Sequence, residues 1–371
     1  NSLKTIIQEY NPKVTEIKGN YNIDFTSGFR LLGLSINTGT GLKSIDSKGQ
    51  GSKKRLHLAI LKWDREVTKQ IDGDRPILKC FDEPDANLHY QAQKQLYDAI
   101  CDENKQNDII QTIICTHSLG MIDKAPASKI NHLLLDENEC STVSYVNTRQ
   151  ENDIRDFLDQ LSDLSGLKNS SLFYEKCFLL VEGESELNAL PTMYYKFYDR
   201  RMIEDGIQII NLESNGGWVN FLKLLSSNKQ NCTAMFLDQD TQEENSPAKI
   251  TPKKLKEIGF RENFVDTNVV FCGNKEFEDE YIDTVLLKVL NQDYRRQDDS
   301  EWTKEHIAEI REEEKFSKYL PMRVKRESSI TDRYIGKPEI AHHYAHRIRR
   351  HEIAQMVSVI KVFDLIRRIA L

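Results

Sequence analysis

Residues 178–186 read Phe178-Leu179-Leu180-Val181-Glu182-Gly183-Glu184-Ser185-Glu186, and this stretch decides the fold. Four apolar residues predict a buried strand, and the glycine after Glu182 permits a sharp turn that leaves this carboxylate at the end of the strand. Open α/β sheets bind their ligands at the carboxyl ends of their strands. We therefore expect an α/β domain with a functional site beside Glu182.

Two further apolar stretches end in a similar way. Residues 207–210 predict a strand that leads into a polar turn at 211–217, and residues 234–237 predict a strand that ends in Asp238-Gln239-Asp240. Residues i and i+2 of an extended segment project to the same side, so Asp238 and Asp240 should lie side by side. Gathered carboxylates repel one another and favour Mg²⁺ or Mn²⁺, whereas no Cys/His cluster suits zinc. Two such motifs, each behind an apolar strand, argue against the alternative that these acids only decorate surface loops.

This pattern resembles the Toprim domain shared by topoisomerases, primases and certain nucleases, in which Glu-Gly and Asp-x-Asp strand ends hold the metals of phosphodiester chemistry. The domain is Rossmann-like, and the resemblance implies metal ligands at Glu182, Glu186, Asp238 and Asp240.

Two later positions extend the resemblance. After a strand predicted at residues 268–272, Glu278 or Asp279 resembles a further acidic ligand, although acids at a helix start also stabilise the helix dipole without a metal. Lys337 is expected on a turn between a glycine and a proline and resembles a late lysine of such nucleases, which would neutralise charge on a scissile phosphate. A surface role for Lys337 stays open, and so does a metal site at His342 and His346, for which a packed or surface role is the alternative.

The composition limits the class of protein. The chain has 371 residues, enough for two domains, and a formal net charge of −7 excludes a protein that coats nucleic acid by bulk charge. Seven cysteines without CxxC spacing indicate reduced thiols in a cytoplasmic protein. No apolar run reaches membrane-spanning length and no signal peptide opens the chain, so no membrane partner is expected.

The first 150 residues contain a second ordered set of motifs. A Ser-x-Gly-x-Gly turn at Ser47, Gly49 and Gly51 precedes a basic helix, whose N-terminal amides attract phosphate. A strand predicted at residues 77–81 ends in Asp82-Glu83, and another at 108–115 ends before His117.

This order resembles the second half of an ABC-type ATPase: signature turn, Walker B, D-loop and switch histidine. The resemblance implies that Asp82 orients Mg²⁺ through water, Glu83 polarises the attacking water and His117 senses the γ-phosphate. It also implies self-association, because the signature turn completes the nucleotide site of a partner.

The phosphate-binding loop GxxxxGK[ST] is missing. Residues 39–44 imitate it, but Leu42 and Asn37 stand where glycines are needed. We expect that the chain begins inside the ATPase domain and binds ATP only with the absent N-terminal half; a degenerate domain is the alternative.

The remaining segments complete the predicted organisation. Residues 132–135 and 142–146 predict a hairpin that closes the ATPase sheet, 187–197 and 218–225 predict helices, and 241–256 predict a loop. Residues 291–314 are strongly charged without an apparent apolar face, which indicates a solvated helix or excursion. Basic residues near the end form a plausible DNA-backbone face, namely Arg347, Arg349, Arg350, Arg367 and Arg368. We predict an ATPase part at 1–150, a helical connector at 151–176, and a Toprim domain with C-terminal helices at 177–371.

An ABC-type ATPase half followed by a Toprim domain resembles the OLD (overcoming lysogenization defect) family of ATPase-nucleases. The resemblance implies a DNA endonuclease or nickase of anti-phage defence, with two metals about 4 Å apart and access gated by the ATPase. Expected partners are double-stranded DNA, a second copy or more of the chain, and a defence-system protein or retron RNA or DNA. The alternatives are a non-catalytic recombination or repair ATPase that binds DNA, and a topoisomerase- or primase-like enzyme.

Overall fold

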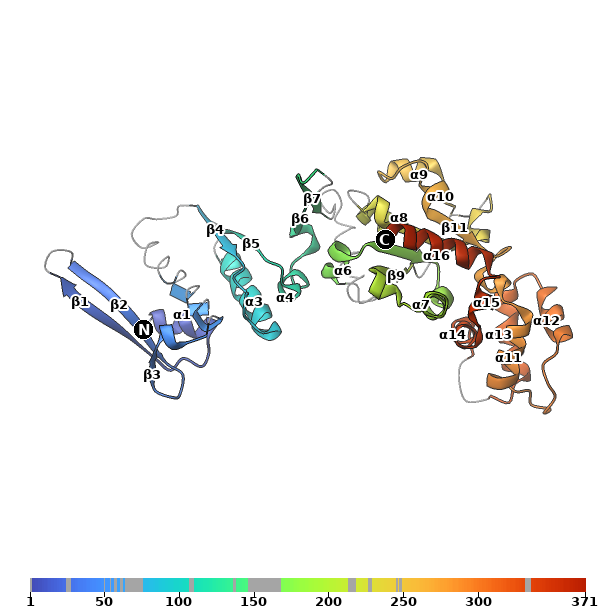
Figure 1. Ribbon diagram of the computed structural model, residues 1–371, viewed down its shortest axis with the longest axis horizontal. Helices are drawn as coiled ribbons and strands as arrows, with labels where there is room; N and C mark the ends of the chain where they lie inside the picture. The colour runs from blue at the N-terminus through green and yellow to red at the C-terminus, as the bar shows by residue number, and fades with distance from the viewer. Residues whose placement is uncertain are drawn as a thin grey trace. The chain divides into compact units, whose positions relative to one another are not determined.

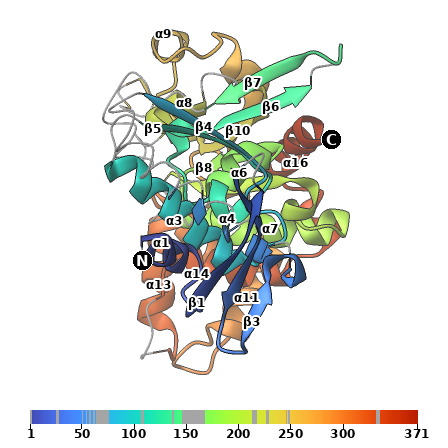
Figure 2. The ribbon, with the colours of Figure 1, turned by 90° about the vertical axis from the view of Figure 1, so that its left-hand side faces the viewer.

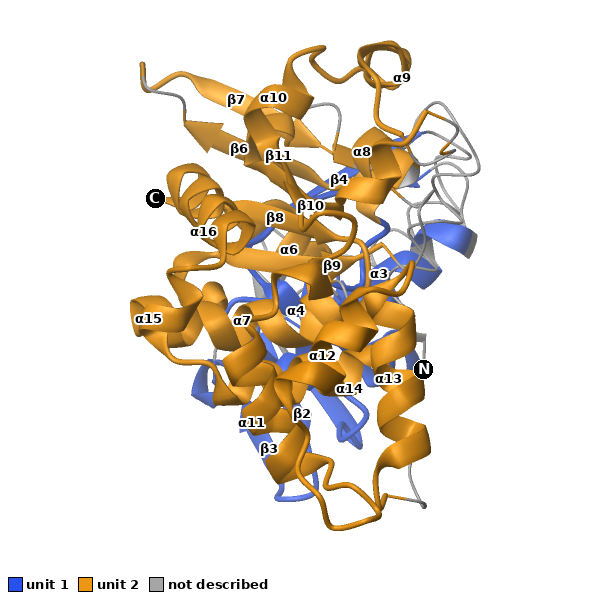
Figure 3. Ribbon diagram, turned by 90° about the vertical axis from the view of Figure 1, so that its right-hand side faces the viewer, with its two compact units in different colours: residues 1–126 blue, residues 127–371 orange. Residues whose placement is uncertain are grey.

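The computed structural model describes two compact units, residues 1–126 and 127–371, which are considered separately (Figure 3). The described residues are 2–24, 28–49, 51–53, 55–56, 59–60, 63, 76–106, 110–135, 138–145, 168–212, 218–225, 229–244, 246, 249–330 and 335–371. Residues 213–217 of the polar turn predicted at 211–217, parts of the basic helix expected after Gly51 and the connector up to residue 167 lie outside them.

The first unit contains an antiparallel and a parallel sheet (Figure 2). Its elements are α1 (Ser2–Tyr10), β1 (Glu16–Asp24), β2 (Gly28–Asn37), β3 (Leu42–Ser44), η1 (Ile45–Ser47), β4 (Ile77–Asp82), α3 (Tyr90–Gln106), β5 (Ile110–Cys115) and α4 (Leu119–Ile122). Strands β1, β2 and β3 form the antiparallel sheet, while β4 pairs with β5 in parallel and places Asp82 opposite Cys115. The two strand ends that carry the predicted nucleotide-site residues therefore meet at one edge.

The second unit is built on a parallel sheet of strand order β11-β10-β8-β9. The strands are β8 (Cys177–Val181), β9 (Ile207–Asn211), β10 (Thr233–Asp238) and β11 (Val269–Cys272), as the apolar runs predict. Every residue of β8 is buried, because both faces of the sheet are covered.

Alternate residues of β8 and β10 face two different cores. Leu179 and Phe236 belong to the core that contains residues of α7 (Glu184–Tyr198) and α16 (Val357–Ala370), and Figure 1 shows α16 lying along the sheet. Phe178 and Met235 belong to the core on the other face, with α8 (Trp218–Leu225), α9 (Pro252–Glu257) and α10 (Phe264–Asn268). This period of two is what a strand buried on both faces requires.

Shorter elements and a helical region complete this unit. Before and between the strands are η2 (Ala127–Lys129), β6 (Asn131–Leu135), β7 (Ser141–Tyr145), α6 (Asn169–Tyr174), η3 (Met202–Asp205), η4 (Gln230–Cys232) and η5 (Gln239–Gln242). After β11 follow η6 (Phe277–Glu280), α11 (Asp283–Asp293), α12 (Lys304–Arg311), α13 (Phe316–Glu327), α14 (Lys337–Arg347) and α15 (Arg350–Ile353). The α14 helix packs on α7, which brings the C-terminal helices to the sheet.

Three expectations about these elements were wrong. Residues 252–257 form α9 and not a loop, because Thr251 caps the helix and Pro252 begins it. The charged stretch 291–314 contains α12, which buries Ile307 and Ile310. Within the described residues, β6 pairs with β7 alone, so the hairpin is not seen to extend a larger sheet, and it belongs to the second unit.

Candidate metal centre

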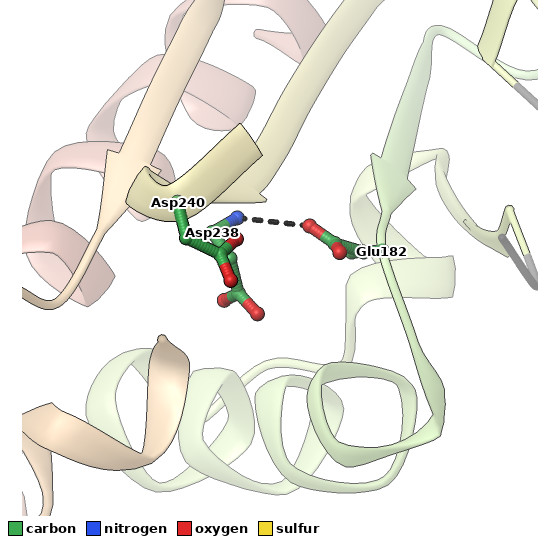
Figure 4. Close-up of side chains that lie close together, drawn as sticks. All are labelled: Glu182, Asp238 and Asp240. Atoms are coloured by element: carbon green, nitrogen blue, oxygen red, sulfur yellow. Dashed lines mark hydrogen bonds between the residues drawn. The ribbon is translucent and has the colours of Figure 1, made fainter. Parts of the chain in front are cut away.

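Three carboxylates from two neighbouring strands converge at the carboxyl edge of the parallel sheet. One oxygen from each of Glu182, Asp238 and Asp240 lies within 4.8 Å of the others (Figure 4). The register places Val181 opposite Phe236, so the residues that follow β8 and β10 meet at the same edge. The backbone N–H of Asp238 donates to Glu182 Oε2 at 3.1 Å and fixes the spacing of the two strand ends.

Asp238 is the buried member of the three, and its pKa is strongly raised. Its side chain is buried, and Oδ1 accepts hydrogen bonds from the Phe277 N–H at 2.9 Å and from Cys272 Sγ at 3.2 Å. Burial, together with the charges of Glu186, Glu182 and Glu278, raises the pKa of Asp238 to about 9. Without a cation, the folded protein therefore favours the protonated carboxyl group at this position.

Glu186 and Glu278 lie buried around Asp238. Glu186 Oε2 accepts from the Gly183 N–H at 3.1 Å, and burial with the charge of Glu278 raises the pKa of Glu186 to about 7. Glu278 Oε1 accepts from Ser185 Oγ at 2.7 Å, whereas Oε2 is buried without a hydrogen-bond partner. A buried, unpartnered carboxylate oxygen is costly, so this atom has a coordination position to offer.

Asp279, the other candidate beside Glu278, serves a different purpose. Its Oδ2 accepts from the backbone N–H groups of Lys275 at 2.8 Å and Glu276 at 3.0 Å, so it caps the start of η6. The geometry therefore favours Glu278 over Asp279 as the residue that faces the acidic cluster.

Two lysines approach the cluster. Lys337 begins α14 and does not lie on a free turn; burial lowers its pKa, but the charges of Glu278, Glu186 and Asp238 raise it more. Lys315 was not anticipated from the sequence, and its Nζ lies 3.0 Å from Asp240 Oδ2. Lys315 lies in no sequence motif. Cys272 could have been anticipated as a neighbour of the site, because it ends the strand predicted at residues 268–272, and this strand pairs it with Asp238.

The residues present fit a hard divalent cation. Each donor is a carboxylate oxygen, neighbouring carboxylates help to raise the pKa of Asp238, and one buried oxygen of Glu278 lacks a partner. His342 and His346 have rings 4.5 Å apart on the exposed side of α14, but among the described residues no third ligand joins them. The candidate metal centre is thus the carboxylate cluster.

The metal-free protein should lose stability as the pH rises. Asp238 and Glu186 keep protons in the folded state at pH values where the unfolded chain has released them. The stability from these protons is complete below the ordinary carboxyl pKa and is lost as the pH rises through about 7 and about 9. We expect the midpoint of thermal unfolding in EDTA to fall by several degrees from pH 6 to pH 9.

Thermal scans at pH 6, 7.5 and 9, with EDTA or with Mg²⁺, measure this dependence. A bound cation replaces the protons, so the Mg²⁺ series should be flatter and the gain from Mg²⁺ largest at pH 9. A midpoint in EDTA that rises over this range would contradict the buried, protonated state of Asp238.

The predicted nucleotide-site residues lie at the joined strand ends of the first unit. Glu83 has a positive φ of 46°, and its N–H donates to Cys115 O at 2.8 Å. This turn brings Glu83 Oε1 to 3.7 Å from His117 Nε2. Asp82 ends β4 directly before Glu83.

Of the glycines in the predicted signature turn, Gly51 packs on the segment that follows Asp82-Glu83, and Gly49 does not. A Cβ on Gly51 would lie 2.7 Å from Leu88 Cδ2 and 3.0 Å from Asn87 O, so glycine permits close packing on the segment after Asp82-Glu83. A Cβ on Gly49 would meet nothing within 4 Å, and Ser47 Oγ donates to Ser44 O at 2.6 Å. The roles of these three residues in nucleotide binding stay predictions.

The arginines predicted to face DNA make contacts within the second unit. Arg347 Nη2 donates to Asp293 at 2.8 Å, Arg368 Nη2 donates to Thr267 O at 3.1 Å, and Arg367 lies 4.2 Å from the centre of the Tyr198 ring. The guanidinium groups of these three arginines are thus already engaged within the unit, although their charge still makes this end basic.

Family comparisons agree with the two sets of motifs. A model described as "AAA ATPase domain" matches residues 1–122, and one described as "Overcoming lysogenization defect protein-like, TOPRIM domain" matches residues 173–240. The chain thus matches an ATPase domain followed by an OLD-like Toprim domain. These matches, with the similarity to a phage Old nuclease reported below, support an ATPase–Toprim organisation similar to that of the OLD family.

Individual relatives are distant. The "Old nuclease" of Escherichia phage P2 is 23% identical over 189 residues, which are 50% of this chain and 32% of that protein. The chain therefore spans about a third of the length of this curated relative. The C-terminal region of the Burkholderia pseudomallei OLD protein aligns at 13% identity with a TM-score of 0.40, over 54% of this chain and all of that one. The SMC head domain of Thermotoga maritima aligns at 18% identity with a TM-score of 0.26, over 40% of this chain and 46% of that one.

Within the described residues, no helix has both the length and the apolar character to cross a membrane.

Proposed function

We propose that this chain is a metal-dependent DNA endonuclease or nickase whose access is gated by its ATPase domain. One observation carries the proposal: Glu182, Asp238 and Asp240 present oxygens within 4.8 Å of one another at the sheet edge of a Toprim domain. The relative described as a nuclease and the hard-oxygen donor set support hydrolysis of a phosphodiester. A role in anti-phage defence, cytoplasmic location and self-association through the ATPase domain belong to the same proposal.

Each residue of the cluster has a distinct part in this mechanism. Glu182, Asp238 and Asp240 would hold the cations, with Glu186 and Glu278 as buried ligands or supports. Bound divalent cations supply Lewis-acid stabilisation of the phosphate charge and a more acidic water nucleophile. Asp238 must release its proton when it becomes a ligand, because its pKa is raised to about 9. Lys337, which begins α14, would donate to an oxygen of the scissile phosphate and balance its developing charge.

The ATPase domain would control this chemistry indirectly. Asp82 and Glu83 end one strand and His117 follows its neighbour, which is a fitting arrangement for Mg²⁺, an attacking water and a phosphate sensor. Nucleotide bound with the support of a phosphate-binding loop would change how two chains associate. That change would alter the access of DNA to the carboxylate cluster of Glu182, Asp238 and Asp240.

Plasmid cleavage tests the proposal. The purified chain should convert supercoiled plasmid to nicked or linear DNA with Mg²⁺ or Mn²⁺ and not with EDTA. Asp240→Asn should lower the rate at least tenfold, because it removes one ligand charge. The control Asp266→Asn changes an exposed carboxylate on α10 and should cut like the wild type.

Three outcomes would redirect the assignment. Equal cutting by Asp240→Asn and the wild type would remove the carboxylate cluster from the mechanism. Metal-independent DNA binding without cleavage would favour a recombination or repair ATPase, and covalent trapping of DNA would favour a topoisomerase-like enzyme.

A further inference from the structure

Lys315 places an ammonium group on the candidate metal centre. Its Nζ lies 3.0 Å from Asp240 Oδ2 and 3.4 Å from Glu276 Oε1. The lysine side chain is 46% exposed, whereas the side chains of Asp240 and Glu276 are 20% and 7% exposed. One positive charge therefore bridges a carboxylate of the cluster and a buried carboxylate beside it.

The segment that carries Lys315 is fastened on both sides of the residue. Arg311, at the end of α12, donates to Tyr281 O at 2.6 Å and to Asp279 O at 3.2 Å. At the start of α13, the Ser317 N–H donates to Glu276 Oε2 at 3.3 Å. These hydrogen bonds attach the connection between α12 and α13 to η6 and the residues that flank it. They hold Lys315 beside Asp240.

A divalent cation and the Lys315 ammonium would compete for the same Asp240 carboxylate. Two positive groups on one carboxylate repel each other at short range, and the ammonium must withdraw for the cation to bind well. Glu276 offers the ammonium a second anchor that is not one of the three clustered ligands. The lysine can therefore leave Asp240 and remain paired with Glu276, next to the cluster.

We propose that Lys315 is the internal counter-ion of the metal centre, which neutralises Asp240 in the metal-free protein and is displaced onto Glu276 when a divalent cation binds. This inference rests on the proposed function, since it concerns the same site. The exchange breaks one ion pair and forms one metal–carboxylate contact, with no covalent change. Its consequence is that the cation binds more weakly than the carboxylates alone would allow.

Removal of the lysine charge should therefore tighten cation binding. Lys315→Gln in the full chain should bind Mn²⁺ about tenfold more tightly than the wild type, a figure kept modest because the lysine is half-exposed and solvent screens it. Lys318→Gln is the matched control, because this exposed lysine of α13 forms no ion pair within the described part of the chain and its change alters the net charge equally. Isothermal titration with Mn²⁺ alone, or spectroscopic counting of free Mn²⁺, gives the affinities without any assay of cleavage.

Asp238→Asn defines the background from cations bound elsewhere on the chain. Wild-type binding above that background, with a tenfold gain in Lys315→Gln and none in Lys318→Gln, supports the counter-ion role. Equal affinities of the wild type and Lys315→Gln overturn it while leaving the metal centre intact. If neither protein binds Mn²⁺ above the Asp238→Asn background, the metal centre itself, and with it the proposed function, is wrong.

Glu276→Gln gives a second readout of opposite sign. This change removes the alternative anchor, so Lys315 should compete harder for Asp240 and Mn²⁺ affinity should fall severalfold. In the Lys315→Gln background the same change should have a smaller effect, because there is no ammonium left to redirect. An equal loss in both backgrounds would show that Glu276 acts only through its own charge and would contradict the exchange.

Discussion

Asp238→Asn is expected to lower the rate of plasmid cleavage by at least a thousandfold and, in the same protein, to raise the stability of the metal-free fold. The loss of activity corresponds to about 4 kcal/mol of transition-state stabilisation. It follows from the place of Asp238 in the cluster with Glu182 and Asp240, where a neutral amide cannot provide the charge that a divalent cation needs.

The gain in stability has a separate electrostatic cause. At pH 7.5 the folded protein must keep a proton on Asp238, whose pKa is raised to about 9, while the unfolded chain releases it. Asparagine needs no proton and can still accept the hydrogen bonds from Phe277 and Cys272. We expect a free energy of unfolding about 2 kcal/mol higher in EDTA. Thermal or urea unfolding measures it.

The two parts of this prediction check each other. Mg²⁺ should raise the unfolding midpoint of the wild type and leave that of Asp238→Asn unchanged. A variant that loses activity together with stability would point to a structural role for Asp238, and one that keeps its activity would remove this residue from the metal centre.

Lys337→Met is expected to lower cleavage by two to three orders of magnitude and to destabilise the protein. Lys337, at the start of α14, is half-buried, and the charges of Glu278, Glu186 and Asp238 hold its pKa above the ordinary value. A preorganised cation of this kind is worth about 3 to 4 kcal/mol to a transition state that gains negative charge. Its loss also leaves buried carboxylates less compensated, at a cost of about 1 to 3 kcal/mol.

Single-turnover cleavage and thermal unfolding separate the two effects of Lys337→Met. Lys337→Arg retains the charge and should recover the stability, with only part of the activity, because the longer planar group places the charge differently. Lys315→Gln is the informative comparison: it also removes one ammonium charge beside the cluster but should tighten Mn²⁺ binding. If both variants behaved alike, the two lysines would only be supplying general positive charge.

Local sequence patterns were enough to predict which acidic residues lie at the carboxyl edge of the sheet. Four apolar residues before Glu182-Gly183, and an apolar run before Asp238-Gln239-Asp240, specify buried strands whose acidic residues lie at their carboxyl ends. The parallel register of β8 and β10 then brings these ends together, as expected for an open α/β sheet. The same reasoning located Asp82 and His117 at adjacent strand ends of the first unit.

Local patterns failed where burial depends on distant partners. The stretch 291–314 is rich in charge, yet Ile307 and Ile310 of α12 are buried, because two apolar residues on one short helix suffice once other helices cover them. A short helix has too few apolar positions to reveal its buried face by periodicity alone.

What the sequence by itself determined is which side chains stand at the ends of the central strands, because strand periodicity and the glycine turn are properties of a few adjacent residues. Only the tertiary structure decided that Glu278 faces the cluster while Asp279 caps η6, and that Lys315 pairs with Asp240 across 75 positions of the chain. The physical reason is that a charge selects its partner by proximity in space, and that proximity is set by the packing of α12, α13 and η6 rather than by any spacing along the chain.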